Sequence, residues 1–368
     1  MTGTAGAARA DRPLAETFAR LIAATGPLSI AHFMAESNAR YYDSRDPLGL
    51  TGDFVTAPEV SQMFGEMIGL WLADIWTRAG APDPVHYVEL GPGRGTLARD
   101  ALRVMRRQGM TPAVHFVEGS TALRAIQREH HPDARWHDDL STLPTDAPLL
   151  LVANEFLDAL PVHQLVKTAA GWRERLVGMH EGRLAPVMGA RPMDAAVTMG
   201  GTVSAALAAL IADAPDGAIL ESSPASAAAV RAVAERLAAQ GGAALFIDYG
   251  HTAPRLGSTL QAVRAHRKVD AFAMPGEADL TAHVDFAAMA ETAEAGGARW
   301  MGTAEQGAWL QALGIGARAQ ALARAAPAHV PALNAALDRL TGESQMGVLF
   351  KVMGLANPGW PAGAGFPR

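Results

Sequence analysis

The stretch YVELGPGRGTLARD at 87–100 combines residue types that can hold a small ligand. Glu89 is followed by Gly91, Gly93 and Gly95, and a helical pattern begins directly after the third glycine. Glycine lets a backbone approach a ligand closely, and the free N–H groups at a helix start point outward. The spacing is G-x-G-x-G, whereas the dinucleotide fingerprint is G-x-G-x-x-G. Because a carboxylate repels a pyrophosphate and attracts a cation, the turn suits an ammonium or sulfonium ligand better than a phosphate.

A second acid, Glu118, closes the next apolar run at 113–118. In nucleoside-binding sheets an acid at this strand end accepts hydrogen bonds from ribose hydroxyls. A solvated acid at the end of a strand is the alternative. Together with Glu89 and the glycines, Glu118 predicts ribose binding.

Asn154, Glu155 and Asp158 directly follow the apolar run PLLLVA, and Asp248 follows a similar run in FIDYG. Ligands of open α/β sheets bind at the carboxyl ends of strands, so these side chains fall where chemistry is expected. The alternative is structural: Asn154 would cap a helical turn that Glu155 and Asp158 stabilise, and Asp248 would act similarly.

The segment TGDFVTAPEVSQMFGE at 51–66 contains a predicted capping box, Thr56 to Glu59, with Pro58 in the first helical turn. Structure alone could explain this pattern. The residues before it, Gly52 to Phe54, add an acid and an aromatic ring, which is more than a cap requires. The apolar residues that follow, from Val60 to Ile75, have helical spacing and are interpreted as core.

Strand-like and helical patterns alternate along the chain, which predicts βαβ units in a parallel α/β sheet. The strand-like runs are 85–90, 113–118, 148–154 and 243–250, with a late strand at 346–355. Two segments interrupt the alternation. Residues 162–187 resemble an inserted β-meander, and the polar residues 252–285 have too much charge for a core element and suggest a lid or binding loop. The Ala-rich stretches 200–240 and 305–340 are expected to be helical.

The composition excludes several classes of protein. The 368 residues are 49% hydrophobic and 18% charged, with a net charge of −6 and no cysteine. Disulfides and thiolate metal sites are therefore impossible, and a general nucleic-acid surface is not expected. His251, His266 and His283 lack close ligand spacing, so no metal site is predicted. The apolar runs are shorter than a membrane span and the N-terminus lacks an apolar signal core, which favours a soluble, cytoplasmic protein.

Five motifs in order, GDFVTAPEVSQMFGE, VELGPGRGTLARD, NEFLDALPVHQ, FIDYG and PGEADLTAHVDF, resemble the MidA family of S-adenosylmethionine-dependent methyltransferases. The resemblance runs from about Tyr41 to Phe286. This family includes a mitochondrial assembly factor that methylates an arginine in a core subunit of respiratory complex I. The resemblance implies a doubly wound, mostly parallel, seven-stranded class I methyltransferase sheet with S-adenosyl-L-methionine as cofactor. It also implies a protein partner that carries the arginine, a complex I subunit or a bacterial equivalent.

The resemblance also assigns roles to residues. Glu89 and the Gly91–Gly95 turn would hold the methionine part of the cofactor, Glu118 the ribose, and Asp139 and Leu140 the adenine. The 51–62 segment would cover the cofactor. The expected binding residues from the cover and the third strand end are Phe54, Thr56, Pro58, Gln62 and Asn154. Carboxylates pair well with a guanidinium, so the expected catalytic residues that would hold the arginine are Glu155 and Asp158, with Asp248 as a second candidate.

The expected domain organisation has an N-terminal helical segment with the cofactor cover, a methyltransferase core, and a substrate-side insertion. Their predicted bounds are 1–80 for the first, 81–161 and 215–368 for the core with its lid insertion at 252–285, and 162–214 for the β-meander and helix. Three other functions fit the pattern: a small-molecule methyltransferase, a non-catalytic assembly factor that retains the fold, and a nicotinamide- or flavin-dependent oxidoreductase. The short glycine spacing disfavours the oxidoreductase.

Overall fold

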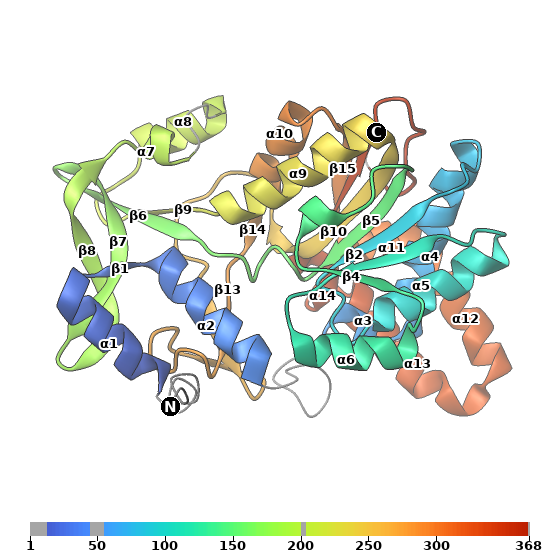
Figure 1. The fold of residues 1–368 in the computed structure, drawn as a ribbon, viewed down its shortest axis with the longest axis horizontal. Helices are drawn as coiled ribbons and strands as arrows, with labels where there is room; N and C mark the ends of the chain where they lie inside the picture. The colour runs from blue at the N-terminus through green and yellow to red at the C-terminus, as the bar shows by residue number, and fades with distance from the viewer. Residues whose placement is uncertain (1–12, 45–54, 200–203, 367–368) are drawn as a thin grey trace, which may run out of the picture. The chain divides into compact units, whose positions relative to one another are not determined.

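The computed structural model describes residues 13–44, 55–199 and 204–366, and the chain forms two compact units (Figure 1). The sheet unit comprises Arg45–Asp158, Ala225–Pro254 and His283–Arg368, and the meander unit comprises Met1–Ser44, Ala159–Pro224 and Arg255–Ala282. These bounds differ from the predicted ones. The predicted N-terminal segment is divided between the units, and most of the polar stretch 252–285 belongs to the meander unit.

Among its described residues, the sheet unit contains a seven-strand path with one further short strand, β14 (Val284–Asp285), beside β10. The order is β15 (Arg299–Glu305), β16 (Phe350–Ala356), β10 (Gly242–His251), β5 (Leu149–Asn154), β2 (His86–Leu90), β3 (Ala113–Val117) and β4 (Arg135–His137). Strands β4, β3, β2, β5 and β10 are parallel, while β16 is antiparallel to both of its neighbours. The prediction of a doubly wound, mostly parallel α/β sheet is confirmed.

The chain reverses its direction of progress across the sheet between β2 and β5. From β2 it proceeds outward to β3 and β4, and it then returns to place β5 on the other side of β2. Adjacent parallel strands whose connections leave in opposite directions open a crevice at their carboxyl ends. This point of the fold is therefore where a ligand site is expected.

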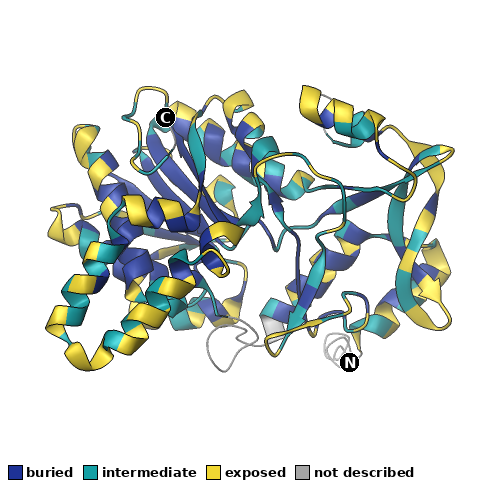
Figure 2. Ribbon diagram, turned by 180° about the vertical axis from the view of Figure 1, so that it is seen from behind, coloured by how far each residue is buried: buried dark blue, intermediate teal, exposed yellow. Residues whose placement is uncertain are grey.

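Helices cover both faces of this sheet, and its central strands are almost entirely buried (Figures 1 and 2). One face carries α4 (Gln62–Arg78), α5 (Thr96–Arg107), α6 (Thr121–His130) and α11 (Gln306–Ala312), and the other carries α9 (Pro224–Gln240) and α10 (Phe286–Ala295). The remaining helices of the unit are α3 (Ala57–Val60), α12 (Ile315–Ala325), α13 (Val330–Thr341) and α14 (Met346–Leu349), with the 3-10 helices η1 (Leu140–Thr142) and η2 (Pro327–His329).

Two predicted elements of the sheet unit differ from the structure. The expected strand at 346–355 begins with the helical turn α14, and extended structure starts only at Phe350. Its apolar letters do not distinguish a buried helical turn from a strand. The helix expected to open at Thr56 is interrupted at Ser61, whose extended backbone ends α3 and whose hydroxyl accepts the Met63 N–H to begin α4.

The meander unit contains an antiparallel sheet, as the alternation at 162–187 predicts. Its order is β1 (Leu28–Ser29), β7 (Gly171–His180), β6 (His163–Thr168) and β9 (Ile219–Ser222), with β8 (Arg183–Met193) also paired to β7. Its helices are α1 (Leu14–Thr25), α2 (Ile30–Ser44), α7 (Ala195–Thr198) and α8 (Ala205–Ala212). Phe18, Phe33 and Val177 are among its fully buried apolar side chains.

The polar stretch 252–285 contributes to the core of the meander unit, so the expectation that it has no core element is wrong. It forms a small sheet of β12 (Arg267–Val269), β11 (Gln261–Arg264) and β13 (Asp279–Thr281), with Ala262 and Leu280 buried. Asn38 makes this burial possible, because its amide pairs with both the N–H and the C=O of Leu280 at 3.1 and 2.8 Å. A buried backbone group needs such a partner. Because Asn38 and Leu280 are far apart in the sequence, this pairing could not be predicted from the local pattern.

Candidate active site

Glu89 lies near the carboxyl end of β2, at the point where the sheet reverses. Its carboxylate Oε2 accepts the Tyr87 hydroxyl at 2.7 Å, and both side chains are buried. Burial raises the pKa of Glu89 to about 8, and the hydrogen bond from Tyr87 offsets only part of that rise. A carboxyl group with such a pKa becomes fully charged near neutral pH only when a cation approaches it.

The glycine turn follows directly and adopts a backbone that favours glycine. Gly91, Gly93 and Gly95 have φ angles of 60°, 55° and 78°, in the left-handed region. The Gly91 N–H donates to Val117 O at 2.9 Å, which fixes the turn to the end of β3. A Cβ atom at Gly91 would lie 3.0 Å from the ring of Phe156, so the turn is closely packed against the loop that follows β5.

Glu118 lies at the end of β3 and is held in place by its neighbours. Its Oε1 accepts the Ser120 N–H at 2.8 Å, and its Oε2 lies 3.3 Å from the amide nitrogen of Gln127. Burial raises the pKa of this carboxyl, whereas the bonds from Ser120 and Gln127 lower it. The group is partly exposed at the strand end, where a ribose acceptor is expected.

Asp139 and Leu140 follow β4 on the next strand end. The Asp139 carboxylate caps η1 by accepting the Ser141 N–H at 2.7 Å, and this bonding with Ser141 lowers the pKa of Asp139. Asp139 is exposed and Leu140 is half-buried. Three neighbouring strands, β2, β3 and β4, thus present Glu89, Glu118 and Asp139 at the same edge of the sheet.

Asn154 and Glu155 lie at the end of β5. Asn154 is 8% exposed and its amide nitrogen donates to Glu155 Oε1 at 3.1 Å, but among the described residues its Oδ1 has no hydrogen-bond partner. Glu155 is partly buried, with a φ of 51°, and its Oε1 also accepts the Ala57 N–H at 3.0 Å. Removal from water raises the pKa of Glu155 to about 7. No helix follows at 155–158, so the alternative of Asn154 as a helix cap is wrong.

Asp248 on β10 binds the backbone of the loop that follows β5. Its Oδ2 accepts the N–H groups of Leu157 and Asp158 at 3.0 and 3.1 Å, and its Oδ1 accepts the Tyr249 N–H at 3.0 Å. Burial, followed by the charges of Asp158 and Glu155, raises the pKa of Asp248 well above the usual value. Asp158 is itself buried, at 6% exposure. All three predicted catalytic acids are therefore brought together.

The predicted cover is described only from residue 55 onward, so Phe54 lies outside the described residues. The expected capping box does not form: Thr56 is the N-cap of α3 but its side chain makes no capping bond. The Glu59 carboxylate instead accepts the Thr96 hydroxyl at 2.5 Å, since Thr96 opens α5 beside it. Pro58 is half-buried and Gln62 is exposed.

The side chains present fit a cationic ligand that also donates hydrogen bonds. Among the described residues no Lys, Arg or His forms an ion pair with Glu89, although its carboxyl is buried. On the adjacent strand Asn154 Oδ1 is a buried acceptor for which the described part of the chain offers no donor. Each such group costs free energy unless a ligand satisfies it. A ligand with an ammonium and a sulfonium group would do so.

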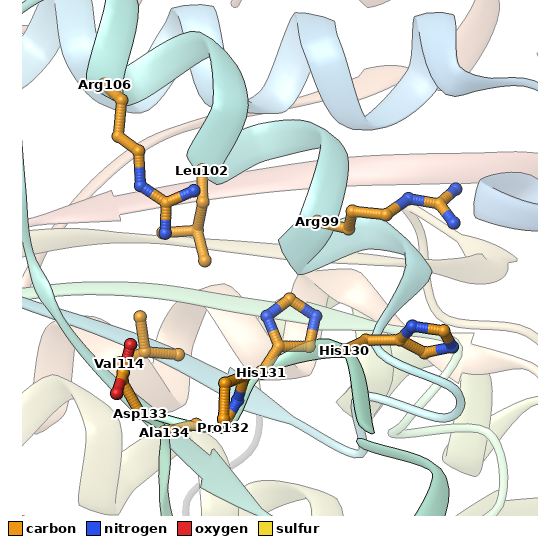
Figure 3. Close-up of a pocket in the computed structure, with 9 residues that line it drawn as sticks. All are labelled: Arg99, Leu102, Arg106, Val114, His130, His131, Pro132, Asp133 and Ala134. Atoms are coloured by element: carbon orange, nitrogen blue, oxygen red, sulfur yellow. The ribbon is translucent and has the colours of Figure 1, made fainter. Parts of the chain in front are cut away.

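Figure 3 shows a pocket of about 110 Å³ that contains none of the predicted site residues. It is lined by Arg99, Leu102 and Arg106 of α5, by Val114 of β3, and by His130, His131, Pro132, Asp133 and Ala134. His131 connects it to the glycine turn, because its Nε2 lies 2.9 Å from Gly95 O. No group of three or more His, Asp or Glu side chains that could hold a metal occurs in the described part of the chain.

Comparison with known proteins decides the family. Residues 67–304 match the family model described as "Putative S-adenosyl-L-methionine-dependent methyltransferase". The chain belongs to this methyltransferase family. It is 35% identical to the protein arginine methyltransferase NDUFAF7 homolog of Drosophila melanogaster, over 93% of this chain and 84% of that one. Identity to the NDUFAF7 protein of Xenopus tropicalis is 36%, over 82% of this chain and 75% of that one.

A solved structure supports the same conclusion. A protein from Burkholderia thailandensis, crystallised with bound S-adenosylhomocysteine, is 31% identical with a TM-score of 0.80, over 94% of this chain and 92% of that one. S-adenosylmethionine is accordingly the cofactor of this methyltransferase. The prediction of a cytoplasmic location is contradicted, because the matched NDUFAF7 proteins are mitochondrial. Among the described residues, no helix is long and apolar enough to cross a bilayer.

Two side chains that contact the glycine turn were not expected from the sequence. Gln127 and His131, four residues apart at the end of α6, contact the carbonyl oxygens of Gly93 and Gly95 at 2.7 and 2.9 Å. A signal was present: Gln127 follows Leu123 by four residues on the buried face of the helix, where an apolar residue is the norm.

Proposed function

We propose that this methyltransferase transfers a methyl group to an arginine side chain of a protein partner. The observation that carries the proposal is the group of acids Glu155, Asp158 and Asp248, which lie together at the carboxyl ends of β5 and β10, beside the glycine turn. A buried acidic group is stabilised by a cation, and a guanidinium is a cation at any physiological pH. Relatives that are named protein arginine methyltransferases support the choice of arginine over other cationic acceptors.

We assign the predicted cofactor residues to the sheet edge in the order of the strands. Glu89 and the turn would hold the methionine part, with Asn154 Oδ1 accepting from the amino group. Glu118 would accept the ribose hydroxyls, and Asp139 and Leu140 would contact the adenine. Residues Thr56, Pro58 and Gln62 would cover the ligand. They lie in or beside α3, which is held next to the glycine turn because Glu155 binds its first residue and Thr96 binds the Glu59 carboxylate.

When bound, S-adenosylmethionine supplies an electrophilic methyl group. Glu155 would accept hydrogen bonds from the guanidinium fork and direct one nitrogen toward that methyl carbon. As the new N–C bond replaces the sulfur–carbon bond of the methyl donor, that nitrogen must lose a proton, and the Glu155 carboxylate would receive it. A pKa of about 7 makes Glu155 a suitable base at neutral pH. Asp248 would act by positioning the loop, because its oxygens already accept three backbone N–H groups.

The partner implied by the family resemblance is a subunit of respiratory complex I or its bacterial equivalent, and we include it in the proposal. The test is to incubate the protein with methyl-labelled S-adenosylmethionine and an extract of cells that lack this methyltransferase. The labelled protein is then digested and the modified residue is located by mass spectrometry. We expect a mass increase on an arginine. Label on lysine, on a carboxyl group or on a metabolite would contradict the proposal.

A further inference from the structure

Gln127 occupies a position that links two parts of the proposed cofactor site. The side chain is fully buried, at 0% exposure, at the end of α6. Its amide nitrogen donates to Gly93 O at 2.7 Å and lies 3.3 Å from Glu118 Oε2, and its Oε1 accepts the Trp136 Nε1–H at 2.8 Å. An amide has two donor hydrogens and one carbonyl oxygen, so both donors and the oxygen have a partner.

Each of these partners belongs to a different element. Gly93 lies in the turn after β2, Glu118 follows β3, and Trp136 lies on β4. The bond from Trp136 fixes which end of the amide faces the turn, because an indole N–H can only donate. Trp136 is itself covered by Arg128, whose guanidinium carbon lies 4.7 Å from the ring centroid. The orientation of the Gln127 amide is therefore determined.

His131 repeats the contact four residues later, with its Nε2 2.9 Å from Gly95 O. A Cβ atom at Gly95 would lie 2.9 Å from the imidazole, so the helix and the turn are in close contact. A carbonyl oxygen accepts, hence the neutral ring must carry its proton on Nε2. Gln127 of α6 and His131, directly after this helix, thus contact the carbonyl oxygens of Gly93 and Gly95.

We propose that Gln127 is a positioning residue for cofactor binding, which sets the Gly93 peptide and the Glu118 carboxylate at the spacing that the methionine and ribose parts of one ligand require. The proposal rests on the proposed cofactor residues, and it adds a residue that does not itself touch the ligand. A Gln127 amide hydrogen that points at Glu118 leaves the other lone pairs of this carboxylate available for ribose hydroxyls. An apolar side chain could fill the same space but would leave the Gly93 carbonyl without a donor.

Calorimetry with S-adenosylhomocysteine tests the proposal without knowledge of the methyl acceptor. Gln127→Met keeps the side-chain length and removes both donors, so we expect affinity to fall roughly 10- to 100-fold at every pH. Gln127→Glu should bind as weakly at pH 8.5, where two carboxylates face each other, and should recover most of its affinity at pH 6. At that pH the pair shares a proton that can serve as the missing donor. Each affinity is expressed relative to the wild-type protein at the same pH.

Gln306→Met is the matched control, because Gln306 is also fully buried and also donates to a backbone carbonyl, that of Leu340 at 2.9 Å. It should lower the melting temperature and leave affinity unchanged. Equal loss of affinity in this control, or wild-type affinity in both Gln127 variants, would overturn the positioning role. Glu118→Ala shows whether a negative result concerns the role of Gln127 alone or the assignment of the whole cofactor site. If it too binds normally, the site assignment fails with the proposal, whereas if it alone loses binding, only the role of Gln127 fails.

Discussion

Asp248 Oδ2 accepts the backbone N–H of Leu157 at 3.0 Å, across 91 residues of sequence. Together with the bond to Asp158, this contact fixes the loop after β5 to the neighbouring strand β10. The loop carries Glu155, so the position of the proposed base depends on the hydrogen bonds that the Asp248 carboxylate accepts.

Removal of this support should destabilise the protein. Asp248→Ala leaves buried N–H groups of the loop without an acceptor, and we expect a loss of about 2–3 kcal/mol in the free energy of unfolding. Asp248→Asn retains one carbonyl oxygen and should lose less. Urea denaturation of both variants measures the difference. Equal stability of the alanine variant and the wild type would mean that water replaces the carboxylate.

Glu155→Gln should separate catalysis from binding. The amide can still accept the Ala57 N–H, so we expect the melting temperature and S-adenosylhomocysteine affinity to stay near wild type. It cannot accept a proton, so methyl transfer should fall by about a hundredfold or more, equivalent to ~2.7 kcal/mol of transition-state stabilisation. The measurement is turnover with saturating cofactor. Full activity in this variant would exclude Glu155 as the base.

Cofactor binding should become tighter as pH rises. The pKa of Glu89 is about 8 without ligand, and a bound cation must lower it, so binding releases a proton wherever the free protein is protonated. Between pH 6.5 and 8 we expect affinity to increase by up to roughly tenfold. Calorimetry in two buffers of different ionisation enthalpy counts the protons released. In Glu89→Gln this release should vanish, and a variant that still releases the same number would place the proton elsewhere.

A row of histidines should make stability fall in acid. His115 is buried, with its ring nitrogens 3.2 Å from His86 and 2.9 Å from His137, and burial followed by these neighbours lowers its pKa to about 4. The unfolded chain binds this proton below pH 6.5 while the folded chain does not, so stability is present above pH 6.5 and is lost toward pH 4. We expect a loss of about 2 kcal/mol from pH 7 to pH 5.

His115→Gln provides the comparison for this effect, because it keeps polar atoms in place but does not titrate. Its absolute stability should be lower, and the decrease from pH 7 to pH 5, measured by urea denaturation, should be smaller than in the wild type. An unchanged decrease would assign the acid sensitivity to other groups.

The sequence predicted the central sheet because its strands are long, apolar runs. It missed β4, since Arg135, Trp136 and His137 form a strand of three residues without an apolar pattern. Individual site residues could be predicted from their place at strand ends, and the structure brings Glu155, Asp158 and Asp248 together.

The bonds that position those residues could not be predicted. Capping by Thr56 and Glu59 follows from local spacing, but the structure replaces it with contacts from Glu155 and Thr96, which belong to other elements. The same holds for Gln127, whose partners lie in the turn after β2, directly after β3 and on β4. Local patterns report propensity, while the choice of partner depends on tertiary packing.

The position of β16 determines when this protein can fold during its synthesis. Residues 350–356 fill the place between β10 and β15, and β10 precedes them by about a hundred residues. Until β16 has been translated, residues 243–249 of β10 present an open edge of unpaired peptide groups. Closure of the sheet therefore waits until Ala356 has left the exit tunnel, and during that interval a chaperone has a defined strand edge to shield.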